Sequence, residues 1–279
     1  MPSANFLAMP FADLRRRIDR SAAYDWAMRC PIMIYCAFIL FRDVGSFRQQ
    51  VLADPSAFQH FNVDVMIAML ARISQWMFVI LLSLQPLFRL RSIRKSDEIL
   101  PRVVALVAVA IPLMFMQLQR APPDTTFNLM TIIIALFANV MCLVTASFLG
   151  RSLSVMPEAR RLVCAGPYGI VRHPLYLSEM LATAGMVLQY RSLPALGLFL
   201  LAIVLQLARA RWEEDVLARA FPDFAAYRGR TSFLFPRDPV HFFAAFLVEP
   251  GVRRRTAFIV ASMVAALAVV ATVLPRLIV

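Results

Sequence analysis

Two clusters of polar residues in this chain have the composition of a ligand site. The first reads GPYGIVRHPLY over residues 166–176, and the second reads RARWEE over residues 209–214. Together they supply aromatic rings, a histidine, arginines and carboxylates, which are groups that bind charged ligands and transfer protons. Because 60% of the residues are hydrophobic, such groups beside apolar segments are costly unless they have partners or a task. The two clusters therefore predict a ligand site.

The first cluster offers a turn, a helix start and two aromatic rings. Gly-Pro at 166–167 fixes a turn, and Pro174 suits the first position of a helix with His173 near its cap. The free N–H groups of a helix N-terminus suit a carboxylate or a phosphate. Tyr168 and Tyr176 could supply faces for a purine ring or a cation. Aromatic and basic residues also gather at membrane interfaces, so an interfacial anchor is an equal alternative on residue types alone.

The second cluster lies on one predicted helix face. Arg209 and Glu213 are four residues apart, which places them on the same side of a helix, and Glu214 follows directly. Arg209 ends an apolar run over 193–209 and is therefore expected at a membrane boundary. A salt bridge on a solvated helix end, worth well under about 1 kcal/mol, explains the same spacing equally well. The residues alone leave both interpretations open.

The elements that carry the clusters are apolar helices. Several apolar runs of membrane length predict an all-α, multi-spanning membrane protein with about seven apolar helices. The runs over 174–190 and 193–209 are each about 25 Å long at 1.5 Å per residue, and their tight connection predicts an antiparallel hairpin. This hairpin would bring the two clusters together. The apolar runs occupy residues 23–41, 63–88, 102–118, 127–149, 174–190, 193–209 and 257–275.

Basic residues alternate across the membrane in one consistent pattern. With a cytoplasmic N-terminus, 22 Lys and Arg residues fall in inner segments and 5 in outer ones. The pattern predicts an odd number of spans, a C-terminus outside, and both clusters on the cytoplasmic side. We expect no cleavable signal peptide and a place in a bacterial inner membrane, in contact with membrane lipids. The apolar segment 239–248 is too short to span and is expected to lie along the interface.

The remaining composition argues against other classes of site. The net charge of +12 sits largely on arginines in short loops, where it sets topology and meets lipid headgroups, so we expect no nucleic-acid partner. The four cysteines form no CxxC pair and three lie in apolar runs, which argues against disulfides and zinc. The three histidines are far apart in sequence. We therefore expect no metal site.

The order of these motifs resembles a known family. Gly-Pro-Tyr, Arg-His-Pro-x-Tyr, an apolar hairpin and Arg-x-x-x-Glu-Glu follow one another, with Phe221, Tyr227 and Pro236 beyond them. This order resembles the isoprenylcysteine carboxyl methyltransferases and the related phospholipid methyltransferases, and it covers about residues 150–236. The resemblance implies an integral membrane methyltransferase that takes S-adenosylmethionine from the cytoplasm and modifies a lipophilic small-molecule or lipidated acceptor. Glu179 stands near the position where a glycine often follows in the family.

The resemblance also implies roles for individual residues. Glu213 would contact the cofactor, and Arg209 would face the methyl acceptor. Arg209 would hold a carboxylate acceptor through a bidentate contact, whereas an amine acceptor would lose a proton to Glu213 or Glu214. Both kinds of acceptor remain open. The cofactor pocket would be lined by Leu162, Val163 and Tyr168 and wrapped further by His173, Pro174, Leu175 and Tyr176.

This interpretation divides the chain into three parts. Two alternative functions also remain possible. Residues 1–149 would form N-terminal helices, 150–236 a methyltransferase-like core, and 237–279 an interfacial segment with a final helix. One rival is a membrane reductase of sterol-reductase-like architecture that uses NADPH. The other is a non-enzymatic assembly or transport component, for which Arg72 and Asp64 offer charge within an apolar run. The sequence does not determine the identity of the acceptor or the oligomeric state.

Overall fold

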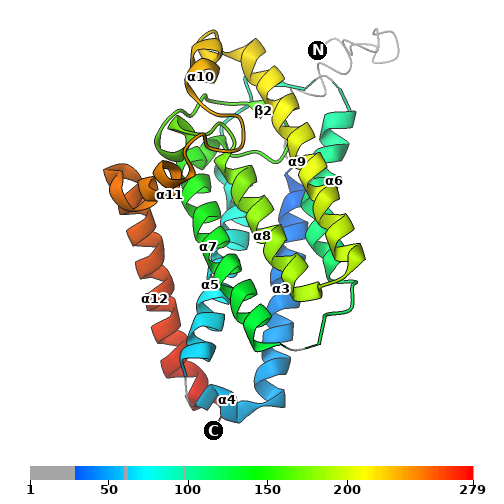
Figure 1. The fold of residues 1–279 in the computed structure, drawn as a ribbon, viewed down its shortest axis with the longest axis vertical. Helices are drawn as coiled ribbons and strands as arrows, with labels where there is room; N and C mark the ends of the chain where they lie inside the picture. Colours follow the sequence, from blue (N-terminus) through cyan, green and yellow to red (C-terminus); the bar gives the residue numbers. More distant parts are fainter. Residues whose placement is uncertain (1–28, 60–61, 97, 123, 279) are drawn as a thin grey trace, which may run out of the picture.

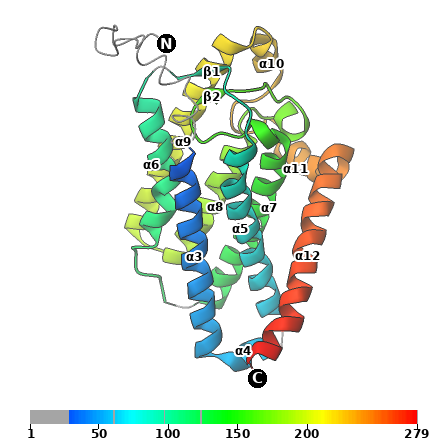
Figure 2. The same ribbon diagram turned by 180° about the vertical axis from the view of Figure 1, so that it is seen from behind.

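In the part of the chain that the structure describes, seven long helices run alternately up and down (Figures 1 and 2). They belong to a computed structural model that describes residues 29–59, 62–96, 98–122 and 124–278. Residues 23–28 of the first predicted apolar run, and all of the sequence before it, lie outside these described residues. The seven helices are α3 (Cys30–Ala53), α5 (Val63–Phe88), α6 (Leu100–Phe115), α7 (Thr125–Leu149), α8 (Pro174–Tyr190), α9 (Leu193–Ala220) and α12 (Pro250–Ile278).

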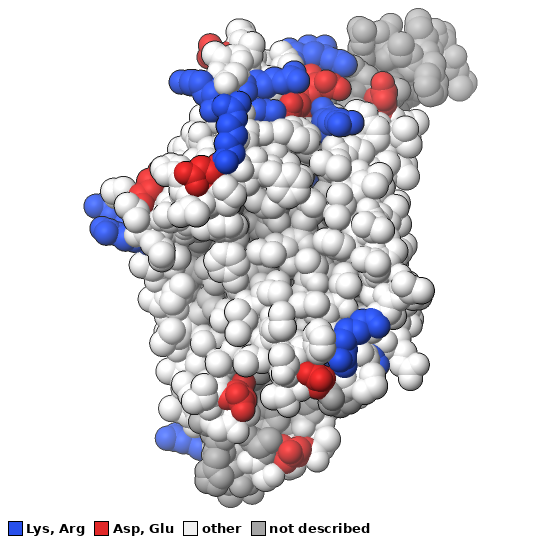
Figure 3. Space-filling view, viewed as in Figure 1, with Lys and Arg blue, Asp and Glu red and all other residues white. Residues whose placement is uncertain are grey.

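Five of these helices, α3, α5, α7, α9 and α12, are long and apolar enough to cross a membrane. The shorter helices α6 and α8, with 16 and 17 residues, lie among them. Charged side chains gather towards the two ends of the face seen in Figure 3, and its middle is almost entirely uncharged. The prediction of a multi-spanning helical protein is confirmed to this extent.

Helix α3 is longer than its apolar run predicted. The sequence placed residues 42–62 outside the membrane as a connection, but the helix continues to Ala53 and the short helix α4 (Pro55–Gln59) follows. Two polar side chains of this extension, Asp43 and Gln50, accept hydrogen bonds from α5. Trp76 Nε1 donates to Asp43 Oδ2 at 2.5 Å, and Arg72 Nη2 donates to Gln50 Oε1 at 3.0 Å. Arg72 therefore has a packing role between two helices.

Helix α7 is the centre of the bundle, with α5 and α8 against it. Its C-terminal half is buried on several sides, with Val144 and Ala138 fully enclosed. Close contact with α8 depends on Gly185, because a Cβ there would lie 3.2 Å from a methyl carbon of Ile134. This packing fixes where the N-terminus of α8 stands, and the first polar cluster begins there.

A polar cap closes one end of the bundle, the upper end in Figure 1. It contains an antiparallel pair of two-residue strands that the sequence did not predict, with Arg94 opposite Ala159 and Lys95 opposite Glu158. The loop after α7 supplies most of the rest of the cap. The two strands are β1 (Arg94–Lys95) and β2 (Glu158–Ala159), and the other short elements there are η2 (Gly150–Ser152), η3 (Gly166–Gly169), α10 (Phe224–Arg230) and α11 (Pro239–Val248).

The predicted helical hairpin is confirmed. Helix α8 ends at Tyr190, where Arg191 adopts a left-handed backbone conformation with φ 43°, and α9 begins at Leu193. Ser192 caps α9 by accepting a hydrogen bond from Ala195 N at 3.3 Å. Because α9 extends past the end of its apolar run to Ala220, it carries residues 209–214 alongside the start of α8.

Candidate active site

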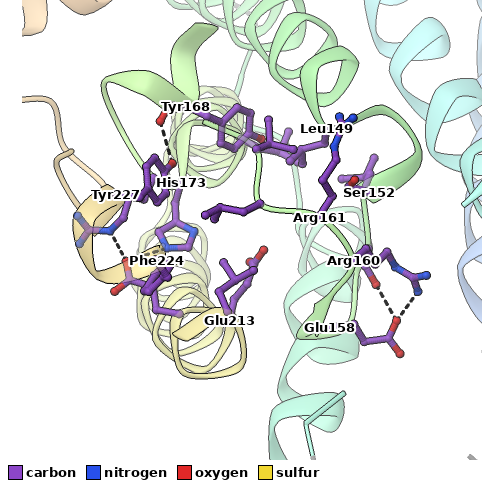
Figure 4. A pocket seen from close by; sticks show the side chains of 18 of the residues that line it. Leu149, Ser152, Glu158, Arg160, Arg161, Tyr168, His173, Glu213, Phe224 and Tyr227 are labelled. Atoms are coloured by element: carbon purple, nitrogen blue, oxygen red, sulfur yellow. Dashed lines mark hydrogen bonds and ion pairs between the residues drawn. The ribbon is translucent and has the colours of Figure 1, made fainter. Parts of the chain in front are cut away.

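A pocket opens in the polar cap where α8, α9, α10 and the loop after α7 meet. It has about 710 Å³ of empty space, part of which is open to solvent. Figure 4 shows Glu213 and His173 on one side of this space and Arg161 and Ser152 on the other. Its walls are Leu149, Ser152, Leu153, Ser154, Glu158, Arg160, Arg161, Leu162, Val163, Tyr168, Arg172, His173, Leu175, Tyr176, Glu213, Glu214, Leu217, Phe224 and Tyr227.

The hairpin brings the two polar clusters into direct contact, as the sequence predicted. The Tyr176 hydroxyl donates to Glu213 Oε2 at 2.8 Å. The His173 ring stacks on the Tyr176 ring at a centroid distance of 5.4 Å and an interplanar angle of 4°. Pro174 opens α8 as predicted, and His173 occupies the cap position without a capping hydrogen bond from its side chain. Pro174 itself is buried behind the wall and is not among the lining residues.

Glu214 holds the first cluster in place. Its Oε1 accepts from Arg172 Nε at 2.5 Å and lies 3.3 Å from His173 Nε2, while Arg228 Nε is 3.9 Å from Oε2. The side chains of Arg172 and Glu214 are each only 9% exposed, so this ion pair is largely shielded from solvent. Glu213, one residue earlier, is directed differently and meets Tyr176.

The segment that carries Arg172 is held against the chain beyond α10. Arg172 N donates to Ser232 O at 2.9 Å, and Ser232 N donates to Ile170 O at 3.0 Å. The Arg172 guanidinium also donates through Nη1 to Thr231 O at 2.5 Å and to Arg228 O at 3.1 Å. Three separate stretches of sequence thus meet around one arginine, and they hold the adjacent His173 at the wall of the pocket.

Two hydroxyl groups in the pocket wall lack a hydrogen-bond partner among the described residues. They are Tyr168 Oη and Ser152 Oγ, and both atoms are shielded from solvent. Burial, together with the nearby Glu213 carboxylate, raises the pKa of Tyr168 well above its ordinary value, so its hydroxyl remains protonated at neutral pH. The backbone of Tyr168 is fixed from the other side, because the Tyr227 hydroxyl donates to Tyr168 O at 2.8 Å. Unpartnered buried hydroxyls are costly and point to a bound ligand that would satisfy them.

The other residues predicted for the cofactor pocket lie in or beside it. Leu162, Val163 and Leu175 line its walls, as do the predicted Tyr168, His173, Tyr176, Glu213 and Glu214. The sequence interpretation missed Ser152, which lies in the turn after α7, and it gave no role to Arg172. An arginine next to a histidine at a helix start was visible as a signal, whereas nothing local marks Ser152.

Arg209 lies next to the pocket without lining it. Its guanidinium is 4.7 Å from the centroid of the Tyr176 ring, on which it stacks. Nη1 donates to Gln206 Oε1 at 2.7 Å, and Nη2 donates to the Val155 carbonyl at 3.2 Å. Glu179 lies 3.9 Å away and also accepts from Gln206 Nε2 at 2.6 Å. Arg209 is 5% exposed, and its Nε has no hydrogen-bond partner within the part of the chain that the structure describes.

Comparison with known proteins bears on this geometry. Residues 124–223 match the phospholipid methyltransferase family. The resemblance read from the motifs is confirmed over that stretch, which contains α7, α8, α9 and the loop that forms most of the pocket. The family match begins at residue 124, before residue 150 where the predicted methyltransferase-like core begins, because it includes helix α7.

Two curated relatives share a shorter stretch. The chain is 43% identical over 77 residues to the cobalt-zinc-cadmium resistance protein CzcN of Cupriavidus metallidurans, covering 27% of this chain and 36% of the relative. It is 36% identical over 81 residues to the nickel-cobalt-cadmium resistance protein NccN of Alcaligenes xylosoxydans xylosoxydans, covering 29% of this chain and 38% of the relative. The chain thus matches little more than a third of the length of either relative. Among the described residues, no group of three His, Cys, Asp or Glu side chains is placed to hold a metal ion.

Proposed function

We propose that this protein is an integral membrane methyltransferase that transfers a methyl group from S-adenosylmethionine to a lipophilic acceptor. The observation that carries the proposal is the contact between the two clusters, with Tyr176 bonded to Glu213 and Arg172 to Glu214 inside the stretch that matches the phospholipid methyltransferase family. Five apolar helices support a place in the membrane, and the bacterial relatives support a bacterial inner membrane. We also propose, from the charge pattern, that the polar cap and the N-terminus are cytoplasmic.

The residues of the pocket fit S-adenosylmethionine. When bound, this group supplies a methyl activated by the positive charge of its sulfonium. The Glu213 carboxylate would attract that cation, and the unpartnered hydroxyls of Tyr168 and Ser152 would gain hydrogen bonds from a polar ligand. Leu162 and Val163 would cover its apolar parts. In this proposal Glu214 is a positioning residue, because its carboxylate is committed to Arg172 and His173.

Arg209 and Glu179 would define the acceptor end of the site. Arg209 stacks on the ring of Tyr176, so it keeps the phenol aimed at Glu213. Its charge is already partly balanced by Glu179, which weakens the case for Arg209 as the grip for a carboxylate acceptor. An amine acceptor suits a site that contains the carboxylates of Glu179 and Glu213, since Glu213 could take up the proton that the amine loses.

Binding of S-adenosylmethionine to purified protein in detergent tests the proposal. We expect calorimetry to detect binding to the wild type and to show it at least about tenfold weaker, a loss of about 1.4 kcal/mol, after Glu213→Ala or Tyr176→Phe. Asp215→Ala on the same turn is the matched control, because its side chain is exposed, and should bind like the wild type. Absence of wild-type binding refutes the proposal, and binding of NADPH in its place supports the rival reductase.

A further inference from the structure

Glu179 is a carboxylate inside the helical bundle, outside the wall of the pocket. It follows Tyr176 by three residues on α8, so it lies on the same helix face, about 4.5 Å farther from the polar cap. Its side chain is 27% exposed, whereas that of its neighbour Arg209 is 5% exposed. A charged group among apolar helices is costly and marks a functional position by default. An accessible carboxylate at this depth therefore calls for a partner.

One oxygen of this carboxylate is already bonded, and the other is available. Glu179 Oε2 accepts from Gln206 Nε2 at 2.6 Å and lies 3.9 Å from Arg209 Nη1. Glu179 Oε1 has no hydrogen bond or ion pair with any residue that the structure describes. An ionised carboxylate accepts hydrogen bonds and donates none. The available oxygen therefore suits an N–H or O–H group and does not suit a second carboxylate.

Glu179 also changes what Arg209 offers to a ligand. Gln206 links the two side chains, because its Oε1 accepts from Arg209 Nη1 at 2.7 Å while its Nε2 donates to Glu179. The Tyr176 ring and the Val155 carbonyl contact other parts of the same guanidinium. A carboxylate that approached Arg209 would meet the like charge of Glu179 beside it, and like charges repel strongly where water is scarce. An ammonium group would instead be attracted to Glu179.

From these contacts we infer that Glu179 selects the charge of the methyl acceptor. Its Oε1 binds the N–H group of a membrane-borne amine in the ammonium form, and its negative charge keeps a carboxylate acceptor away from Arg209. This inference rests on the proposed methyltransferase function and assigns the choice between the two kinds of acceptor to one side chain. Removal of the charge on Glu179 should leave Arg209 unbalanced and shift the preference towards a carboxylate.

Photo-crosslinking in phosphatidylcholine nanodiscs tests this choice. The probes are an alkylamine and a fatty acid of equal chain length, each carrying a diazirine beside its polar group, and mass spectrometry measures the label on α8 and α9. We expect the wild type to take up more amine than acid. Glu179→Gln should lower this amine-to-acid ratio at least about tenfold, because a hydrogen bond to a charged group is replaced by one to a neutral group.

Two further variants separate a change of preference from a loss of structure, which thermal unfolding detects. Asp215→Asn is the matched control, since it also removes one negative charge but from an exposed position on α9, and it should keep the wild-type ratio. The double variant Glu179→Gln, Arg209→Gln leaves no unpaired charge in this part of the bundle, so it should fold even if Glu179→Gln does not. It should take up the two probes alike, because neither charge remains.

Binding of S-adenosylmethionine to the wild type is measured separately, so that the two proposals can fail independently. A wild-type ratio in folded Glu179→Gln or in the folded double variant overturns the inference, and so does a wild type that prefers the fatty acid. If the wild type binds S-adenosylmethionine, these results leave the proposed function intact. Absence of that binding refutes the proposed function and the inference with it. A lowered ratio in Glu179→Gln, together with S-adenosylmethionine binding to the wild type, supports both.

Discussion

Replacing Glu214 by glutamine should destabilise the protein, because Arg172 would lose its charged partner. The change keeps the volume of the side chain but removes the negative charge beside Arg172, whose side chain is 9% exposed. Removing one member of a buried ion pair costs roughly 3–5 kcal/mol, because the remaining charge is left buried. Arg172 keeps its hydrogen bonds to the carbonyls of Arg228 and Thr231, so we expect the low end, about 3 kcal/mol. At roughly 2–4 °C per kcal/mol, Tm should fall by about 6–12 °C.

Thiol reactivity during heating measures this loss in detergent. Cys36 and Cys142 are buried and should react with a fluorogenic maleimide only after unfolding, once the exposed Cys30 and Cys164 have been blocked. Glu213→Gln is the matched control. The wild type and Glu213→Gln should melt within about 2 °C of each other, because the bond from Tyr176 reaches a carboxylate that is directed into the pocket.

Two results would show the reasoning about Glu214 to be wrong. The first is a Glu214→Gln variant that melts with the wild type, which would mean that Arg172 is solvated and that the pair contributes little. The second is a Glu213→Gln variant that is destabilised as much as Glu214→Gln. That outcome would mean that the two neighbouring carboxylates do not have separate roles.

Three further predictions follow from single features of the cap. Gly166→Ala should lower stability by about 1–2 kcal/mol because the φ of residue 166 is +60°. The loss should be larger still, since the new Cβ would lie 2.5 Å from the Phe148 ring, and thermal unfolding measures it. Tyr227→Phe should cost about 1–3 kcal/mol in the same assay, because the buried carbonyl of Tyr168 loses its hydrogen bond. The exposed Cys164 should react with a membrane-impermeant maleimide in inverted vesicles and not in intact cells, and the opposite pattern would reverse the proposed topology.

The architecture was predictable because the apolar runs and the turn residues between them determine it. Seven apolar runs became seven helices, and the short connection at 190–194 gave the hairpin. An antiparallel hairpin sets residues before its turn against residues after it, which is why Tyr176 and Glu213 meet as expected. The predicted end of α3 was wrong, because hydropathy shows only where the apolar residues stop. It does not indicate that Asp43 has a hydrogen-bond partner, Trp76, on another helix.

The division of roles within the site was not predictable from the sequence. Neighbouring residues on a helix point about 100° apart, so Glu213 and Glu214 meet different partners, and only the orientation of α9 decides which carboxylate faces the pocket. The involvement of Arg209 with Gln206 likewise depends on side-chain directions. The pairing of β1 with β2 joins residues far apart in sequence, and two-residue strands leave no periodic pattern to detect.

The three-way junction around Arg172 has a consequence for biosynthesis. Its side chain donates to the carbonyls of Arg228 and Thr231, and its backbone pairs with Ser232. These three residues leave the ribosome well after α8 and the loop that precedes it. Membrane insertion of the α8–α9 hairpin can therefore finish while the loop that carries His173 is held by Glu214 and still lacks its contacts with residues 228–232. The nascent chain acquires a finished pocket only when residue 232 has emerged, so a ribosome stalled before that point leaves a protein that is inserted in the membrane but has no assembled site.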